Sequence, residues 1–292
     1  MKTEEIRRMA VIGAGMMGSQ ITEILSRIGS YEINLVDITD ELVKKGIDSI
    51  EGRLERFFVA KGKLTADEKK SVMDRIKSFI DLEKAVQDVD FVIEAVTEDL
   101  GLKKDIFEKL DKHAPSHAIL ASNTSFQNIS EMASVTRRPE KVVGMHFFNP
   151  VSVMKLIEVV RGSHTSDETV ELACDLSLKL GKEPVRCRDS SYGFLANRAY
   201  ITLAKEALQM VWERVAPPDE IDKALKLGYN LPMGPLEVMD FTGTWQILVA
   251  SEQDAMRELG PEKGSLHPLI RMMDRAGYTK IYDFWKDILS RW

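Results

Sequence analysis

The spacing of apolar residues divides the chain into two regions. Up to about residue 188, short apolar runs typical of buried strands alternate with stretches in which apolar residues recur every three or four positions, as in amphipathic helices. After about residue 189 only the helical spacing remains. Strands that alternate with helices predict βαβ units, so we expect a mainly parallel, doubly wound α/β sheet followed by an all-helical domain. The strand-like runs are RMAVIGAG, INLVD, DFVIEAV, AILASN, VVGMHFF, LIEVV and EPVRCR.

One helical stretch interrupts this alternation. Residues 41–78 lie between the second and third strand-like runs and carry two helical patterns. The second pattern begins at Thr65, which has Glu68 three positions later, the spacing of a capping box. We therefore predict a Rossmann-type domain over residues 1–188 with an inserted helical hairpin at about 41–78. An all-helical domain would follow over residues 189–292.

Composition narrows the class of protein. Of the 292 residues, 44% are apolar and 29% are charged, which is ordinary for a globular protein. A formal net charge of −6 gives no basic excess to neutralise phosphates, so general nucleic-acid binding is not expected. No segment has the roughly 20 apolar residues of a membrane helix. Two cysteines, Cys174 and Cys187, fit reduced thiols, and we expect a soluble cytoplasmic protein.

A glycine-rich loop follows the first strand-like run. The segment VIGAGMMG matches G-x-G-x-x-G with Gly13, Gly15 and Gly18, and with Met16 and Met17 between the last two glycines. Alone the pattern also occurs at ordinary strand–helix turns, but here an apolar strand precedes it and an amphipathic helix follows. In that context glycines let the backbone approach a pyrophosphate at a helix N-terminus.

Asp37 ends the next strand, about 20 residues further on, and completes the dinucleotide-binding pattern. A carboxylate there accepts hydrogen bonds from both ribose hydroxyls and would repel a 2′-phosphate. No arginine follows in DITDE to reverse that preference. The sequence therefore favours NAD(H) over NADP(H) as cofactor, with FAD as the minor alternative.

The segment KVVGMHFFNPVSVMKLIEVV places His146 and Glu158 inside two apolar, strand-like runs. A single histidine in a strand is more often structural than catalytic, and no other histidine has a convincing metal-ligand spacing with it. The short connection allows the two strands to be neighbours, so that Glu158 would bond one imidazole nitrogen and leave the other free to take a proton. A dehydrogenase needs such a base, and both interpretations stay open on the residues alone.

Several segments taken in order resemble the L-3-hydroxyacyl-CoA dehydrogenase family, which includes the short-chain 3-hydroxybutyryl-CoA dehydrogenases. These are GAGMMG, EAVTED, SNTS, HFFNP with LIEVV, the pair Asn197–Arg198, and DKALKLGYNLPMGPLEVMD. The resemblance spans roughly residues 8 to 245. It implies an NAD-dependent enzyme that interconverts 3-hydroxyacyl-CoA and 3-oxoacyl-CoA, and a homodimer formed through the helical domain.

The resemblance also implies roles for individual residues. His146 would be the general acid/base and Glu158 the carboxylate that orients it, while Ser125 and Asn197 would bind the substrate oxygen. Glu98, Lys103 and Asn149 would line the cofactor site together with Ser125. The hairpin would contact CoA, with Arg53 and Lys61 near the expected positions.

Plainer interpretations exist for some of these residues. SNTS also fits a helix N-cap, Asn197 also fits a structural role early in a helix, and charge runs such as that of the hairpin are usually solvated faces.

The chain departs from the family pattern in three places. A segment DSSYGF precedes Asn197 where the family has a Pro-Gly-Phe turn, DFTGTWQI replaces Gly-Leu-Asp, and an aromatic, helix-compatible tail, AGYTKIYDFWKDILSRW, replaces a basic glycine-rich end. Acyl chain length and pathway stay open, with fatty-acid β-oxidation one possibility. The competing hypotheses are a dehydrogenase of a free hydroxy acid or sugar acid, and a non-catalytic NAD-binding protein.

Overall fold

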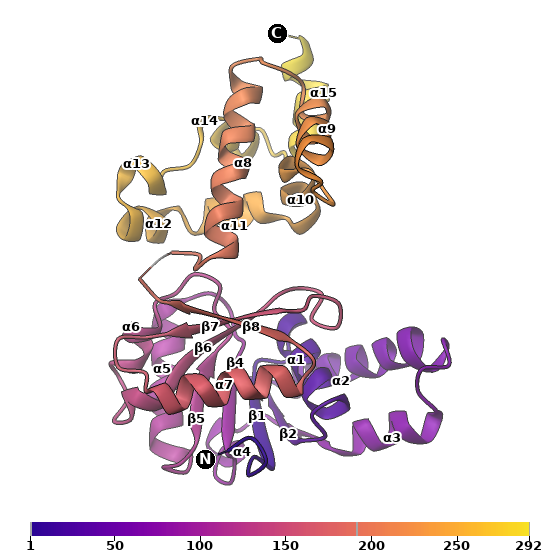
Figure 1. Cartoon of the computed structure of the whole chain (residues 1–292), viewed down its shortest axis with the longest axis vertical. Coiled ribbons are helices and arrows are strands. Elements are labelled where there is room, and N and C mark those ends of the chain that lie inside the picture. The colour runs from indigo at the N-terminus through magenta and orange to yellow at the C-terminus, as the bar shows by residue number, and fades with distance from the viewer. Residues whose placement is uncertain (1, 191, 292) are drawn as a thin grey trace. The chain divides into compact units, whose positions relative to one another are not determined.

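The chain divides into two compact units, Met1–Ser190 and Ser191–Trp292. A computed structural model describes residues 2–190 and 192–291, apart from the side chain of Arg291. The first unit is built on a sheet with helices against it, and the second consists of helices (Figure 1). This arrangement confirms the predicted fold class, a Rossmann-type sheet domain followed by a helical region.

The sheet of the first unit has eight strands in the order β3-β2-β1-β4-β5-β6-β7-β8. Neighbouring strands are parallel except for β6 and β7, which pair antiparallel. The order β3-β2-β1-β4-β5-β6 is that of a dinucleotide-binding fold, in which ligands bind at the carboxyl ends of the strands. The strands are β1 (Arg8–Ile12), β2 (Glu32–Val36), β3 (Ile76–Phe79), β4 (Phe91–Glu94), β5 (Ile119–Ser122), β6 (Val142–Phe147), β7 (Leu156–Arg161) and β8 (Glu183–Arg188).

Helices cover the sheet and supply the rest of the core. Strands β4, β5 and β6 are buried along their whole length, as parallel strands covered on both faces should be. Phe107 from α5 and Ile21 from α1 are fully buried. The helical elements are α1 (Met16–Arg27), α2 (Asp40–Leu54), the π-helical turn η1 (Glu55–Val59), α3 (Ala66–Asp74), α4 (Leu82–Ala85), α5 (Leu100–His113), α6 (Ile129–Ala133), η2 (Pro139–Lys141) and α7 (Asp167–Lys179).

The inserted hairpin is formed by α2, η1 and α3, which project from one side of the sheet (Figure 1). The Thr65–Glu68 capping box is present at the start of α3, as predicted. The predicted end of the hairpin at residue 78 is wrong, because α3 ends at Asp74 and Ile76–Phe79 form strand β3.

This edge strand has no continuous apolar run, since Lys77 and Ser78 are exposed. Its conformation depends on backbone pairing with β2, to which Arg75 also contributes a carbonyl that accepts from the Ile33 N–H at 2.8 Å. A pairing of this kind leaves no local signal in the sequence.

The second unit packs shorter helices around α8. Ala204, Leu208 and Val211 of α8 are buried in one cluster with Leu236, Leu269 and Phe284. Within the helix-compatible aromatic tail, Ile281–Asp287 form α15, and Ile281 and Phe284 of this helix are buried in the same cluster. None of the helices within the described residues is long and apolar enough to cross a membrane. The elements are α8 (Ala196–Trp212), α9 (Pro218–Tyr229), α10 (Pro235–Thr242), α11 (Thr244–Ala250), α12 (Glu252–Leu259), α13 (Pro261–Gly264), α14 (Pro268–Arg275), α15 (Ile281–Asp287) and η3 (Leu289–Arg291).

Candidate active site

The glycine loop joins β1 to α1 in a turn that tolerates no side chain at two of its three glycines. Gly13 has a φ of +102°, and a Cβ there would lie 2.6 Å from the Ala95 carbonyl oxygen. A Cβ on Gly18 would lie 1.8 Å from the Gly13 oxygen. Around Gly15 there is open space within 4 Å of the Cβ position. The loop therefore turns tightly and keeps its outer side clear for a ligand.

The start of α1 suits an anionic group. Gly15 is the N-cap residue and offers no side chain to the first N–H groups of the helix. These N–H groups and the helix dipole favour a pyrophosphate. Met16 is exposed at this end of α1, whereas Met17 is half-buried against the core of the sheet unit.

Asp37 follows β2 and lies beside the glycine loop. Its Oδ2 accepts from the Ala14 N–H at 2.7 Å, and its Oδ1 accepts from the Ile38 N–H at 2.7 Å. Two such bonds hold the carboxylate in place and leave lone pairs for two ribose hydroxyls. The loop, the helix start and this carboxylate together fit NAD.

A buried lysine lies between two carboxylates next to the ends of β4 and β5. The Lys103 side chain is 1% exposed, and its Nζ lies 2.7 Å from Glu94 Oε1 and 3.3 Å from Glu98 Oε2. Glu94 also accepts from the Ser122 hydroxyl at 2.5 Å and from the Val96 N–H at 2.8 Å. Because the Glu94 side chain is also fully buried, loss of Lys103 would leave its carboxylate without a counter-charge.

Glu98 in turn orders the segment that carries Ser125. Its Oε1 accepts from the backbone N–H of Ser125 at 2.8 Å, from that of Phe126 at 2.9 Å, and from the Thr124 hydroxyl. The N-cap of the following helix α6 is Asn128, so the N-cap interpretation of SNTS does not hold. SNTS is instead a turn whose backbone is held by Glu98.

His146 and Glu158 face each other across two strands. They are direct partners in the antiparallel pairing of β6 with β7, and both side chains are buried. His146 Nδ1 lies 2.7 Å from Glu158 Oε2, and His146 Nε2 lies 3.1 Å from Ser125 Oγ. An ionised carboxylate only accepts, so Nδ1 carries a proton, and in the neutral imidazole Nε2 then presents its lone pair. Ser125, His146 and Glu158 thus form one hydrogen-bonded chain with His146, a potential base, in the middle.

Comparison with known proteins identifies the family. The model of the "3-hydroxyacyl-CoA dehydrogenase, NAD binding domain" matches residues 8–190, and that of the "3-hydroxyacyl-CoA dehydrogenase, C-terminal domain" matches residues 193–281. The chain belongs to the 3-hydroxyacyl-CoA dehydrogenase family. It is an NAD-dependent oxidoreductase, which confirms the predicted enzyme class and cofactor.

Individual relatives match nearly the whole chain. The probable 3-hydroxybutyryl-CoA dehydrogenase of Bacillus subtilis is 43% identical over 94% of this chain and 94% of its own. Human mitochondrial hydroxyacyl-coenzyme A dehydrogenase is 37% identical over 91% of this chain and 86% of its own. The crystal structure of (S)-3-hydroxybutyryl-CoA dehydrogenase from Ralstonia eutropha has a TM-score of 0.87 at 38% identity, covering 94% of this chain and 95% of that one.

The hairpin of this dehydrogenase carries the residues expected near CoA. Arg53 Nε lies 2.8 Å from Oε2 of the buried Glu23 on α1, and Arg53 Nη1 donates to Ser49 Oγ at 2.6 Å. Arg53 therefore ties the hairpin to α1. Lys61 is exposed, and its Nζ lies 5.6 Å from the centre of the exposed Phe57 ring.

Asn197 belongs to the helical unit, as the second residue of α8, and is half-buried. The departure from the family pattern lies just before it. Gly193 and Phe194 both have positive φ values, of +78° and +50°, and the Phe194 side chain is buried. The buried ring and the two left-handed residues fix the start of α8. The other three predicted catalytic residues, Ser125, His146 and Glu158, come from the sheet unit.

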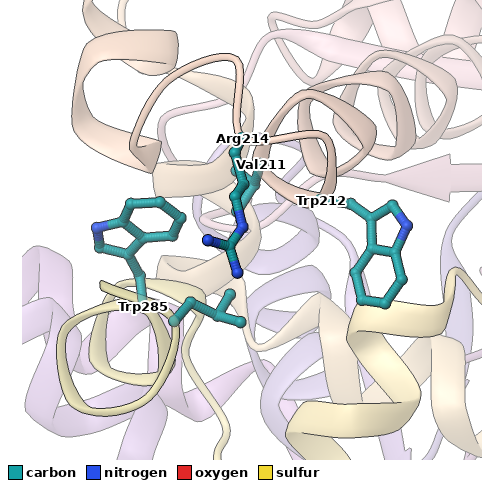
Figure 2. A pocket seen from close by; sticks show the side chains of 5 residues that line it. Val211, Trp212, Arg214 and Trp285 are labelled. Carbon is teal, nitrogen blue, oxygen red and sulfur yellow. The ribbon is translucent and has the colours of Figure 1, made fainter. Parts of the chain in front are cut away.

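The helical unit also has a small pocket at the end of α8. Its volume is about 180 Å³, and the Arg214 side chain lies between those of Trp212 and Trp285 (Figure 2). Val211 and Leu289 complete its lining. None of the residues predicted from the sequence to bind cofactor or substrate lines this pocket.

Two residues that contact predicted cofactor-site residues were not predicted from the sequence. Glu94 was missed, although a glutamate inside the otherwise apolar run DFVIEAV was a signal comparable to that of Glu158. Gln20, on α1, donates to Asn149 Oδ1 at 2.9 Å. It gave no signal, because its partner lies 129 positions away in the sequence.

Proposed function

We propose that this protein is an NAD-dependent L-3-hydroxyacyl-CoA dehydrogenase in which His146 is the general acid/base and Glu158 its orienting carboxylate. The observation that carries the proposal is the hydrogen-bonded chain of Ser125, His146 and Glu158, at 3.1 and 2.7 Å. A lone structural histidine would need neither a buried carboxylate on one nitrogen nor a half-exposed hydroxyl on the other.

The residues divide the proton chemistry between them. His146 Nε2 takes the proton of the 3-hydroxyl, and Glu158 stabilises the imidazolium that forms. The Ser125 hydroxyl holds the substrate oxygen near Nε2, and Asn197 polarises the same oxygen. When bound, NAD⁺ supplies the hydride acceptor. In the reverse direction His146 returns its proton to the 3-oxo group.

The cofactor binds along the glycine loop and the carboxyl ends of the strands. Gly13, Gly15 and Gly18 admit the pyrophosphate, and Asp37 accepts from the adenine-side ribose. Met16 and Met17 flank the loop. At the nicotinamide end lie Glu98, Lys103, Ser125 and Asn149.

We propose a short 3-hydroxyacyl-CoA, such as 3-hydroxybutyryl-CoA, as substrate. Relatives named for that substrate align over nearly the whole chain. The hairpin suits the CoA moiety, because Lys61 and Arg56 flank the exposed ring of Phe57, at 5.6 and 5.3 Å from its centre. An aromatic face with two cations offers stacking to a base and charge to phosphates. Arg53 lies on the side of the hairpin that faces α1, where it bonds Glu23.

We propose that the enzyme is a cytoplasmic homodimer joined through its helical unit. This unit exposes large apolar side chains, among them Phe241, Leu227 and Val215, which fits a surface covered by a second copy. Both cysteines are free thiols, and burial raises the pKa of Cys187 to about 12. Unreactive thiols of this kind suit a reducing compartment.

The proposal is tested by mixing the purified protein with acetoacetyl-CoA and NADH and following nicotinamide absorbance. NADPH and free acetoacetate serve as controls. Fast loss of absorbance only with NADH and the CoA ester is expected. Turnover of free acetoacetate at a similar rate would instead favour an enzyme of free hydroxy acids.

A further inference from the structure

Gln20 links α1, the helix that follows the glycine loop, to the turn after β6, the strand that carries His146. It lies on α1, one turn after the glycine loop, and its side chain is half-buried. Its Nε2 donates to Asn149 Oδ1 at 2.9 Å and to the Met16 carbonyl at 3.2 Å. Its Oε1 accepts from the Val151 N–H at 2.9 Å. One amide thus uses both of its ends to hold residues 149–151 against α1.

The orientation of both side-chain amides follows from one backbone group. The Val151 N–H can only donate, so the oxygen of Gln20 must face it. The nitrogen of Gln20 therefore faces Asn149, and the oxygen of Asn149 must face Gln20. This leaves Asn149 with its Nδ2 group, a donor, directed away from α1. Asn149 is exposed, and its Nδ2 makes no hydrogen bond to the described residues.

We propose that Gln20 is a positioning residue that makes Asn149 a hydrogen-bond donor to the nicotinamide half of the cofactor. Asn149 comes three residues after His146 and just beyond the carboxyl end of β6, the edge of the sheet where the nicotinamide must lie for proton and hydride transfer to occur together. The acceptors that NAD offers there are the carboxamide oxygen and the ribose and phosphate oxygens. An Asn149 turned the other way would present an oxygen to an oxygen. The inference rests on the proposed place of Asn149 in the cofactor site.

The sharpest variant is Gln20→Glu, because a carboxylate has the same shape and can only accept. One of its oxygens still accepts from the Val151 N–H, and the other now faces Asn149 and attracts the Nδ2 group. Asn149 then turns its oxygen toward the cofactor. We expect the Kd for NADH to rise about tenfold, the scale of one lost and one repulsive polar contact. Gln20→Met, which removes all three hydrogen bonds of the side chain without reversing Asn149, should raise it less.

To separate the effect of the added charge on the pyrophosphate from the effect on Asn149, Gln20→Glu is also made in an Asn149→Ala background. If Gln20 acts through Asn149, the substitution costs little in that background, because there is no amide left to turn. An equal loss in both backgrounds would overturn the proposal. So would an Asn149→Ala variant that binds NADH as tightly as the wild type.

Binding is measured by NADH fluorescence titration without acyl-CoA, so the result does not depend on the identity of the substrate. Unfolding temperatures show whether each variant is folded. In turnover, a positioning role predicts a higher KM for NADH with a nearly unchanged kcat, and a fall in kcat alone would count against it. Thio-NADH, in which sulfur replaces the carboxamide oxygen, identifies the acceptor. A smaller cost of Asn149→Ala with this analogue assigns the carboxamide, and an equal cost assigns a ribose or phosphate oxygen.

Discussion

At the scale of single residues, the site depends on buried polar side chains whose partners fix their chemical state. His146 is the clearest case, because Glu158 holds its Nδ1 and Ser125 faces its Nε2. Without Glu158 the imidazole would lose both its orientation and the charge that stabilises its protonated form. The tautomer of His146 is therefore set by Glu158, which the pairing of β6 with β7 places opposite it.

Replacing His146 by glutamine should remove the base and leave the cofactor site in place. We expect kcat for acetoacetyl-CoA reduction to fall about 100-fold or more, the scale of a positioned acid/base, with the Kd for NADH nearly unchanged. His117→Gln is the matched control, since His117 bonds Asp90 away from this site. Equal turnover in wild type and His146→Gln would exclude His146 from the mechanism. Glu158→Gln should also slow turnover.

Lys103 is a second buried polar residue whose partners matter, because its charge lies between Glu94 and Glu98. Lys103→Met would leave the Glu94 carboxylate buried without its cation, and the free energy of unfolding should fall by about 3–5 kcal/mol. Denaturant unfolding measures this, with the exposed Lys109→Met on the same helix as control. Adding Glu94→Gln to Lys103→Met should restore part of the loss. No recovery would show that the two side chains are not coupled.

At the scale of helices, strands and loops, the elements predicted correctly are those marked by residues close together in the sequence. The apolar runs of β4 and β6, the glycine loop and the Thr65 capping box are each visible within a few residues. Strand β3 was missed because an edge strand is defined by its pairing with β2. Gln20 was missed for a similar reason, because its partner Asn149 is distant in the sequence. The His146–Glu158 contact was accessible because both residues interrupt apolar runs joined by a short connection.

In the glycine loop, alanine substitutions at two different glycines should have different effects on stability and NADH binding. Gly18→Ala places a Cβ 1.8 Å from the Gly13 oxygen, so the loop must open and both stability and NADH binding should be lost. At Gly15 the Cβ meets open space, and Gly15→Ala should fold normally but bind NADH more weakly, because the methyl group occupies the path of the pyrophosphate. Thermal unfolding and NADH titration separate the two. Unimpaired NADH binding by Gly15→Ala would contradict this use of the loop.

At the scale of the whole molecule, the two units contribute different parts of the proposed chemistry. The sheet unit holds the cofactor residues and the chain of Ser125, His146 and Glu158, whereas Asn197 comes from the helical unit. The sequence departures also fall in the helical unit and in the segment leading to it, where Gly193 and Phe194 adopt positive φ values.

The homodimer proposed above would be formed by the helical unit. If its exposed apolar side chains form a dimer interface, light scattering after gel filtration should give about twice the 33.0 kDa of one chain. Phe241 is 79% exposed in this unit, and Phe241→Glu should shift the equilibrium toward the monomer, because a carboxylate is costly to bury in such an interface. Val153→Glu is the matched control, since Val153 is 67% exposed in the sheet unit and should leave the dimer intact. A wild-type protein that elutes as a monomer at micromolar concentration would refute the assembly and leave the exposed surface of the helical unit to another partner.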